Sequence, residues 1–132
     1  MKKLLVAVVL LTCSISFAAE CVNEKGEDIY NQPEVFQALI EKAESCYAAK
    51  SLAEACAYGS SLDVMTANTA YEVCNKELTQ LKPSAKVVAT LNTMNKMCNT
   101  KYAKQDGTMY RSMNAFCRLS ALQWIIGIAS PN

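Results

Sequence analysis

The chain has 132 residues, a length that predicts a single domain, and its 13 basic and 12 acidic side chains leave a net charge of +1. It contains no histidine, which excludes the commonest general base of enzymes and the commonest metal ligand. Its four glycines are spread singly, which excludes a glycine-rich phosphate-binding loop.

Residues 1–18 have the pattern of a secretory signal peptide. Lys2 and Lys3 precede an apolar run over residues 4–11, and small residues stand at Ser16 and Ala18, the positions that a signal peptidase reads. The run is shorter than the roughly 20 residues of a membrane-spanning helix. We therefore expect removal of residues 1–18 and a single domain over 19–132. An alternative is lipid attachment at Cys13, which would make the membrane a partner, although the preceding threonine departs from the usual lipoprotein pattern.

The short double-lysine start is typical of a bacterial signal, so we expect an exported protein, periplasmic or extracellular. Six cysteines follow the predicted cleavage site, namely Cys21, Cys46, Cys56, Cys74, Cys98 and Cys117. An even number of cysteines in an oxidising compartment predicts a framework of three disulfides. No Cys-x-x-Cys motif occurs, so thiol exchange of the thioredoxin kind is not predicted.

Apolar residues recur at spacings of three and four through most of the mature chain, and strand patterns are nearly absent. Helices are expected over about 33–49, 51–58, 61–81, 84–102 and 108–127, the second being short. Two of these segments share a pattern, because Asn-Thr, a cysteine and Asn recur 24 residues apart around Cys74 and Cys98. The last helix is apolar on most sides, which indicates a central, buried position, although a docking surface is the alternative. The fold prediction is an all-α, disulfide-stapled bundle of about four principal helices with antiparallel neighbours.

Helix breaks suggest which cysteines pair. Ser51 and Glu54 fit a capping box, so a helix is expected to begin at Ser51. Residues equally far from a tight turn face each other in a helical hairpin, since each residue rises about 1.5 Å. Cys46 and Cys56 are equidistant from Ser51, and Cys98 and Cys117 lie almost evenly about Gly107. The predicted pairs are Cys46–Cys56 and Cys98–Cys117, which leaves Cys21–Cys74.

The charges are split along the chain. Residues 19–72 contain three basic and ten acidic side chains, a net charge of −7, whereas residues 73–132 have eight basic and two acidic side chains, a net charge of +6. A candidate basic partner surface in the second half comprises Lys96, Lys101, Lys104, Arg111 and Arg118. Tyr102 and Tyr110 lie among them, a composition that can bind nucleic acid, but export argues against that partner. An envelope protein or an anionic envelope polymer fits better, and solvated helix faces are the simpler interpretation.

Two further residue classes have a simple and a functional interpretation. Glu41 with Glu44, or Glu72 with a loop acid, could act as paired carboxylates in glycoside cleavage, but acids at helical spacing usually form a solvated face. The methionines of the helical segments are most simply core residues, since Met fills irregular gaps, and a metal-binding cluster is the alternative. These are Met65, Met94, Met97, Met109 and Met113.

The sequence therefore favours a protein without cofactor, metal or catalytic residues. The predicted function is a non-catalytic binding or inhibitory module that acts on an envelope protein or polymer. The alternatives are a carboxylate-dependent hydrolase of cell-wall glycan and a structural envelope protein.

Overall fold

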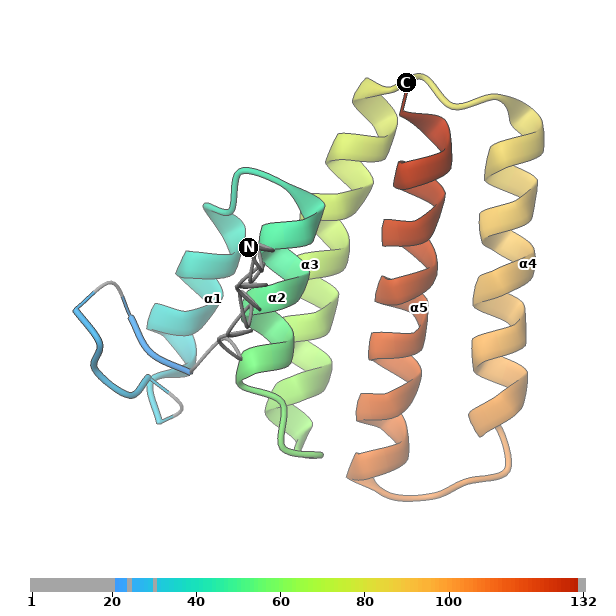
Figure 1. Ribbon diagram of the computed structural model, residues 1–132. Coiled ribbons are helices and arrows are strands. Elements are labelled where there is room, and N and C mark those ends of the chain that lie inside the picture. The colour runs from blue at the N-terminus through green and yellow to red at the C-terminus, as the bar shows by residue number, and fades with distance from the viewer. Residues whose placement is uncertain (1–20, 24, 30, 131–132) are drawn as a thin grey trace, which may run out of the picture.

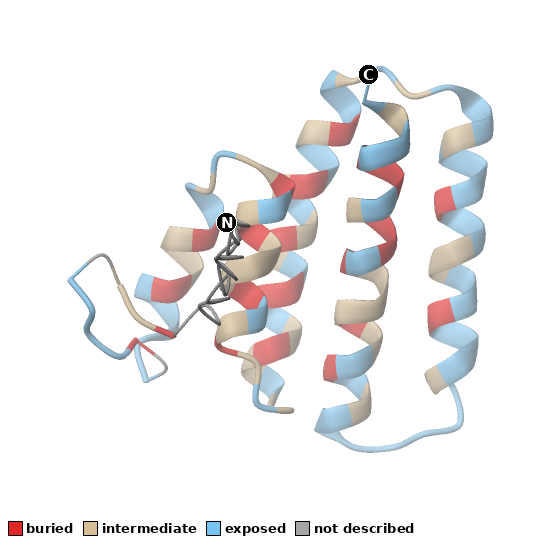
Figure 2. Cartoon of the chain, viewed as in Figure 1, coloured by how far each residue is buried: buried red, intermediate tan, exposed pale blue. Residues whose placement is uncertain are grey.

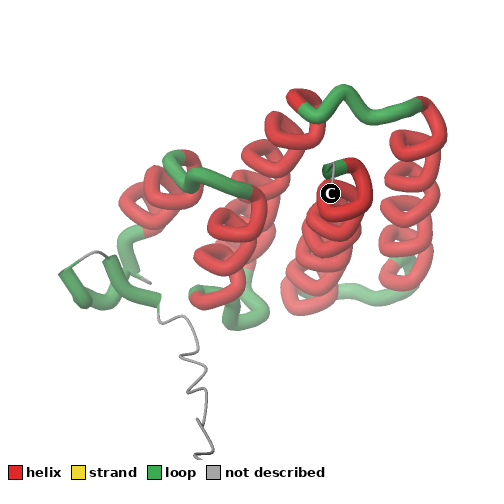
Figure 3. Tube along the Cα trace, turned by 45° about the horizontal axis from the view of Figure 1, so that its top comes forward, coloured by secondary structure: helices red, strands yellow, loops and turns green. Residues whose placement is uncertain are grey.

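The computed structural model describes residues 21–23, 25–29 and 31–130, which form five helices and no strand beyond an isolated bridge between Val22 and Asp28 (Figures 1 and 3). The helices are α1 (Pro33–Glu41), α2 (Cys46–Ala55), α3 (Ser61–Gln80), α4 (Ala85–Tyr102) and α5 (Thr108–Ala129). The all-α prediction is confirmed, but there are five helices rather than about four. The predicted signal peptide and Cys13 lie outside the described residues.

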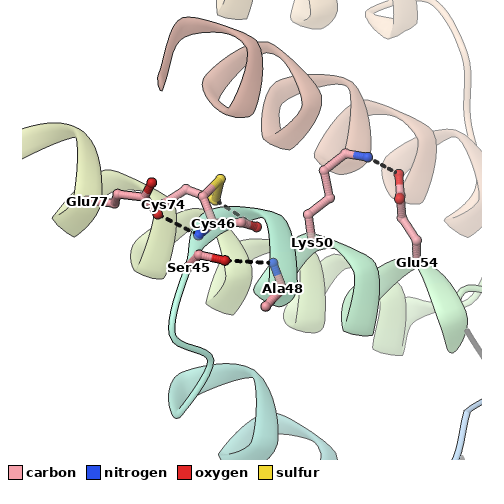
Figure 4. Close-up of a disulfide and its surroundings, with 7 residues drawn as sticks. All are labelled: Ser45, Cys46, Ala48, Lys50, Glu54, Cys74 and Glu77. Atoms are coloured by element: carbon pink, nitrogen blue, oxygen red, sulfur yellow. Dashed lines mark hydrogen bonds and ion pairs between the residues drawn. A yellow bond between two sulfur atoms is a disulfide. The ribbon is translucent and has the colours of Figure 1, made fainter. Parts of the chain in front are cut away.

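The break between α1 and α2 consists of residues 42–45, and α2 begins directly after it at Cys46. The predicted start of this helix was Ser51. The Ser45 hydroxyl accepts a hydrogen bond from the Ala48 N–H (3.2 Å), and the Glu77 carboxylate of α3 accepts one from the Cys46 N–H (2.6 Å; Figure 4). The first backbone N–H groups of a helix have no partner inside it, so these two oxygens satisfy donors that would otherwise be free. Ser45 and Glu77 thus define where α2 begins.

The predicted capping box at Ser51 is wrong. Ser51 lies inside α2, and Glu54 instead forms an ion pair with Lys50 one turn earlier, with 2.6 Å between Nζ and Oε1. The pair lies on the side of α2 toward α5 (Figure 4). A Ser-x-x-Glu pattern occurs by chance within helices, and the Lys50–Glu54 pair supplies a competing use for the glutamate.

The shift of this break overturns two of the three predicted disulfides. Cys46 begins α2 and Cys56 caps its other end, so their ten-residue separation spans about 15 Å of helix, whereas bridged Cα atoms lie within about 7 Å. Cys46 is bonded to Cys74 of α3, with 4.3 Å between the Cα atoms. Cys56 is bonded to Cys21, with 4.8 Å between the Cα atoms.

The third predicted bridge, Cys98–Cys117, is confirmed, with 5.8 Å between the Cα atoms. It joins α4 to α5 across the hairpin around Gly107, where the break was correctly placed. Three intramolecular disulfides indicate an oxidising environment of the kind that exported proteins meet. Within the described part of the chain, the helices are too short or too polar to cross a membrane.

The helices form an open row, in which the prediction of antiparallel neighbours holds for α4 with α5 but not for α3 with α5 (Figure 1). Helix α5 lies between α3 and α4, and no Cα atom of α3 comes within 8 Å of α4 (Figure 1). Helices α1 and α2 pack on the other side of α3, and α2 also touches α5. Helices α3 and α5 run in the same direction, and α4 runs against both (Figure 1). Helix α4 is therefore an edge element that packs chiefly against α5, with a hydrogen bond from Asn95 to the Tyr71 hydroxyl of α3.

The core follows this arrangement, with burial concentrated in the middle of the row (Figure 2). Leu119, Leu122 and Ile125 of α5 are at most 1% exposed, which confirms the predicted central position of the last helix. Helix α4 contributes two buried residues, Leu91 and Cys98. Its attachment therefore depends on a small apolar contact and on one disulfide.

A buried carboxylate joins the starts of α3 and α5. Asp63 is fully buried and accepts hydrogen bonds from the backbone N–H groups of Tyr58, Gly59 and Ser60 and from the hydroxyls of Ser60 and Ser112. Gly59 makes this turn possible because it adopts a φ of +78°. Burial alone would raise the pKa of Asp63, but the hydrogen bonds from Ser112, Tyr58, Gly59 and Ser60 outweigh it and lower the pKa below its ordinary value.

Candidate binding surface on the α4–α5 hairpin

An open apolar groove of about 460 Å³ lies between α4 and α5. Its walls are Met94, Met97, Cys98 and Lys101 of α4 and Cys117, Ser120 and Ala121 of α5. Spacings of three and four residues place each set on one side of its helix. The Cys98–Cys117 disulfide joins the two walls, so the width of the groove is fixed covalently at this level.

Large apolar side chains extend the groove onto the surface. Met97 is 66% exposed, Trp124 56% and Met113 44%. Met113 lies one turn before Cys117 and Trp124 one turn after Ser120, so both continue the same face of α5. Single exposed apolar residues are common, but a group of them beside an apolar groove marks an interaction site. We call this surface, from Met113 to Trp124 with Met94, Met97 and Lys101, the hairpin groove.

The prediction that the methionines belong to the core is wrong for most of them. Met94 packs against the core as expected. The other four are exposed by 36% or more, namely Met65, Met97, Met109 and Met113. Met109 and Met113 were misjudged because α5 is apolar on two sides, and only one of these sides can face α3. Among the described residues, no group of three or more His, Cys, Asp and Glu side chains is arranged to hold a metal ion.

The hairpin groove lies in a strongly basic part of the chain. Residues 81–132 contain seven basic side chains and one acidic side chain, and neither α4 nor α5 contains an acid. Lys101 borders the groove, and Lys96 and Lys101 together border a shallower hollow beside Met97. No ion pair between described residues joins a base of this hairpin to an acid of α1, α2 or α3. The surface therefore carries uncompensated positive charge beside apolar area.

The structure does not gather the five predicted basic residues on one face, because Arg111 and Arg118, seven residues apart, share the side of α5 opposite the groove. Lys96, Lys101, Lys104 and Arg111 are exposed. Arg118 is half-buried, with its guanidinium 5.2 Å from the centre of the Tyr71 ring, and the Tyr71 hydroxyl accepts a hydrogen bond from Asn95 (2.9 Å). Arg118 and Ser120 are two residues apart, which is about 200° around the helix axis. Arg118 therefore lies on the opposite face from the groove and joins α3 to α5 by a cation–π contact.

The acids considered for glycoside cleavage lie elsewhere. Glu41 and Glu44 border a hollow of about 190 Å³ near the break between α1 and α2, together with Glu77. The Glu77 carboxylate is already engaged at the start of α2. Glu72 is exposed on α3, outside this hollow. Of the acids considered, Glu41 and Glu44 therefore share one small hollow, and Glu72 does not border it.

Sequence reasoning missed the main features of the groove. It placed Trp124 and Met113 in the stripe of a buried helix and did not single out Ser120 or Ala121 as lining residues. The available signal was the second apolar stripe of α5, offset from the one that contains Leu119 and Leu122. Comparison of the chain with protein-family models, with curated proteins and with solved structures finds no match.

Proposed function

We propose that the protein is a non-catalytic binding module, exported to the bacterial envelope, and that it recognises a protein partner through the hairpin groove. The observation that carries this proposal is the apolar groove on a hairpin that has six basic side chains and one acidic side chain over residues 85–129. Such a surface favours a partner with both apolar and negatively charged groups. Binding would allow the module to inhibit an envelope enzyme or to attach to an envelope assembly.

The apolar character of the groove favours a protein over an anionic polymer. A polymer of phosphate or uronic acid groups would need exposed bases but no groove lined by methionine and alanine. Protein interfaces, in contrast, are enriched in tryptophan and methionine. Exposed Trp124 is suited to act as an anchor, and the flexible thioether of Met97 can adapt to a partner surface.

The location is supported by the disulfides, which persist in oxidising compartments. The periplasm is the proposed destination because residues 1–18 resemble a bacterial signal peptide. Intact-mass measurement of the exported protein tests both points. A chain that begins at Ala19 with no free thiol supports the proposal, whereas retention of residues 1–18 contradicts it.

The binding function is tested by affinity capture from a bacterial envelope extract with the tagged protein. Met97→Glu adds one negative charge beside the groove, and Lys76→Glu on α3 makes a charge change twice as large far from it. The proposal predicts a stoichiometric protein that the wild type and Lys76→Glu retain, that Met97→Glu loses, and that high salt releases. Capture that is indifferent to Met97→Glu would show that the groove is not the binding surface. Circular dichroism of each variant verifies that the fold is unchanged.

A further inference from the structure

We infer that the hairpin groove accommodates one face of an acidic amphipathic α-helix supplied by the partner. This inference rests on the proposed function and specifies the partner segment. It is carried by three observations on the described residues: the shape of the groove, its length and the position of its charges.

The groove has the shape that a third helix needs. Its two walls are neighbouring antiparallel helices, α4 and α5, and the groove between them is open to solvent along its side. A helix packed on two others places its side chains into the valley between them, as helix-in-groove recognition does. The small side chains of Ser120 and Ala121 leave room in this valley for larger groups of a partner.

The length of the apolar surface fits about three turns of helix. The α5 wall extends from Met113 to Trp124, a separation of 11 residues that spans about 16 Å at 1.5 Å per residue. The α4 wall, from Met94 to Lys101, covers about 10 Å at the same rise. A partner helix with apolar residues at positions i, i+3 or i+4, i+7 and i+11 would fill this surface.

The charges specify which kind of helix fits. The basic side chains near the groove lie on the α4 side, where Lys101 borders it and Lys96 lies beside Met97. The α5 side is apolar and contains no acid. A helix with glutamates along one edge of its apolar stripe would place them opposite α4, and complementary charge of this kind accelerates association and fixes orientation.

The same features disfavour a lipid ligand. A flat bilayer cannot reach the floor of a concave groove, where the Cys98–Cys117 disulfide and Ala121 lie. Sites for small apolar ligands enclose 70–90% or more of the ligand surface. The hairpin groove has a volume of about 460 Å³ but is open along its side, so it would leave much of such a ligand exposed.

The experiment uses Trp124, the only tryptophan of the chain, as a reporter within the surface. Three synthetic 18-residue peptides with the same leucine stripe are titrated into the protein. They have glutamate, glutamine or lysine along one edge of that stripe. The acidic peptide is expected to shift Trp124 emission to shorter wavelength as the indole is covered, to bind about tenfold more tightly than the neutral peptide, and to weaken with salt. The basic peptide is expected not to bind.

Variants locate the binding. Met97→Glu and Lys101→Glu are expected to weaken the acidic peptide by about tenfold each, the first by charge repulsion at the apolar contact and the second by reversal of a neighbouring charge. Lys76→Glu changes the net charge as Lys101→Glu does but lies on α3, and a change below about twofold is expected because the charge is screened at that distance. None of these variants adds a second tryptophan, so Trp124 stays the single reporter.

Several outcomes would overturn the inference. Binding of the basic peptide as tight as that of the acidic one, or no binding of any peptide, excludes an acidic helix as the ligand. A Trp124 shift with vesicles of phosphatidylglycerol but not with peptide assigns the groove to lipid. A Trp124 shift that appears when the protein alone is concentrated assigns it to a second copy of this chain. If these results coincide with a captured envelope protein that Met97→Glu releases, the proposed function stands and the acidic-helix inference fails.

Discussion

Loss of the Cys98–Cys117 disulfide is expected to release α4 while the rest of the row stays folded. The change is the double substitution Cys98→Ala and Cys117→Ala, which introduces no buried hydroxyl. Helix α4 packs chiefly against α5, is joined to α3 by a hydrogen bond from Asn95 to Tyr71, and has Leu91 as its only other buried residue. Few contacts other than the bridge therefore oppose its detachment.

The size of the effect follows from the length of chain that the bridge closes. The two cysteines are 19 residues apart, and closure of a loop of that length limits the unfolded chain by about 3 kcal/mol in the chain-entropy description. Since 1.36 kcal/mol corresponds to a factor of ten, the equilibrium constant for opening of α4 should rise about 100-fold. Amide exchange in residues 85–102 should accelerate by a similar factor.

The assay is hydrogen–deuterium exchange with peptide-level mass spectrometry. The matched variant is Cys46→Ala with Cys74→Ala, whose bridge closes 28 residues and therefore has a similar entropy term, about 3.5 kcal/mol. Both cysteines of that bridge are at most 1% exposed and join α2 to α3 in the core, so its loss should accelerate exchange in all helices. Equal acceleration of α3 and α4 in the Cys98→Ala, Cys117→Ala protein would refute the assignment of α4 as an independently opening edge.

The remaining predictions concern stability. Asp63→Asn turns an amide group toward several N–H and O–H donors and should lower the free energy of unfolding by about 3 kcal/mol, measured by urea denaturation. Ser112→Ala should lower the same free energy by about 1 kcal/mol. Because the pKa of Asp63 is lowered in the folded protein, its ionised carboxylate contributes fully to the free energy of unfolding above the ordinary Asp pKa of about 3.9. This contribution is lost as the pH falls below that value through the folded pKa. Asp63→Asn should remove this part of the acid sensitivity, and an unchanged dependence of stability on pH would contradict the prediction. Leu91→Ala should accelerate amide exchange in α4 with a cost of about 2–3 kcal/mol, and a protected α4 would contradict the weak attachment described above. Met97→Glu should leave the free energy of unfolding within about 0.5 kcal/mol of the wild type, because the side chain is mostly exposed.

The sequence predicts those parts of the fold that depend on local information. Pro33, Ser60, Ser84 and Gly107 lie at or next to helix starts, as helix-start and turn signals indicate. The Cys98–Cys117 bridge was predictable because a turn of known position separates two helices of known phase.

What the sequence does not predict depends on distant partners. The start of α2 depends on Glu77, which is 31 residues away and accepts a hydrogen bond from Cys46 N–H. Because α2 begins at Cys46 and not at Ser51, Cys46 and Cys56 lie at opposite ends of one helix. Two of the three disulfides therefore differ from the predicted pairs. The arrangement of the helices in an open row could not be predicted from the sequence either. Helix periodicity shows that α5 has two apolar faces but does not show which one α3 covers. The hairpin groove is the uncovered face, with Trp124 at its edge.

Asp63 has a consequence for the register of the two central helices. Because α3 and α5 run in the same direction, the partially positive ends of both helix dipoles lie at one end of the molecule, where they repel each other. The Asp63 carboxylate, in the first turn of α3, accepts hydrogen bonds there from the segment that precedes α3 and from Ser112 in the second turn of α5, and its negative charge offsets both. Sliding of α5 along α3 by one turn would move Ser112 by about 5.4 Å and break its hydrogen bond to the buried carboxylate. The Asp63 side chain thus favours a single register of α5 along α3.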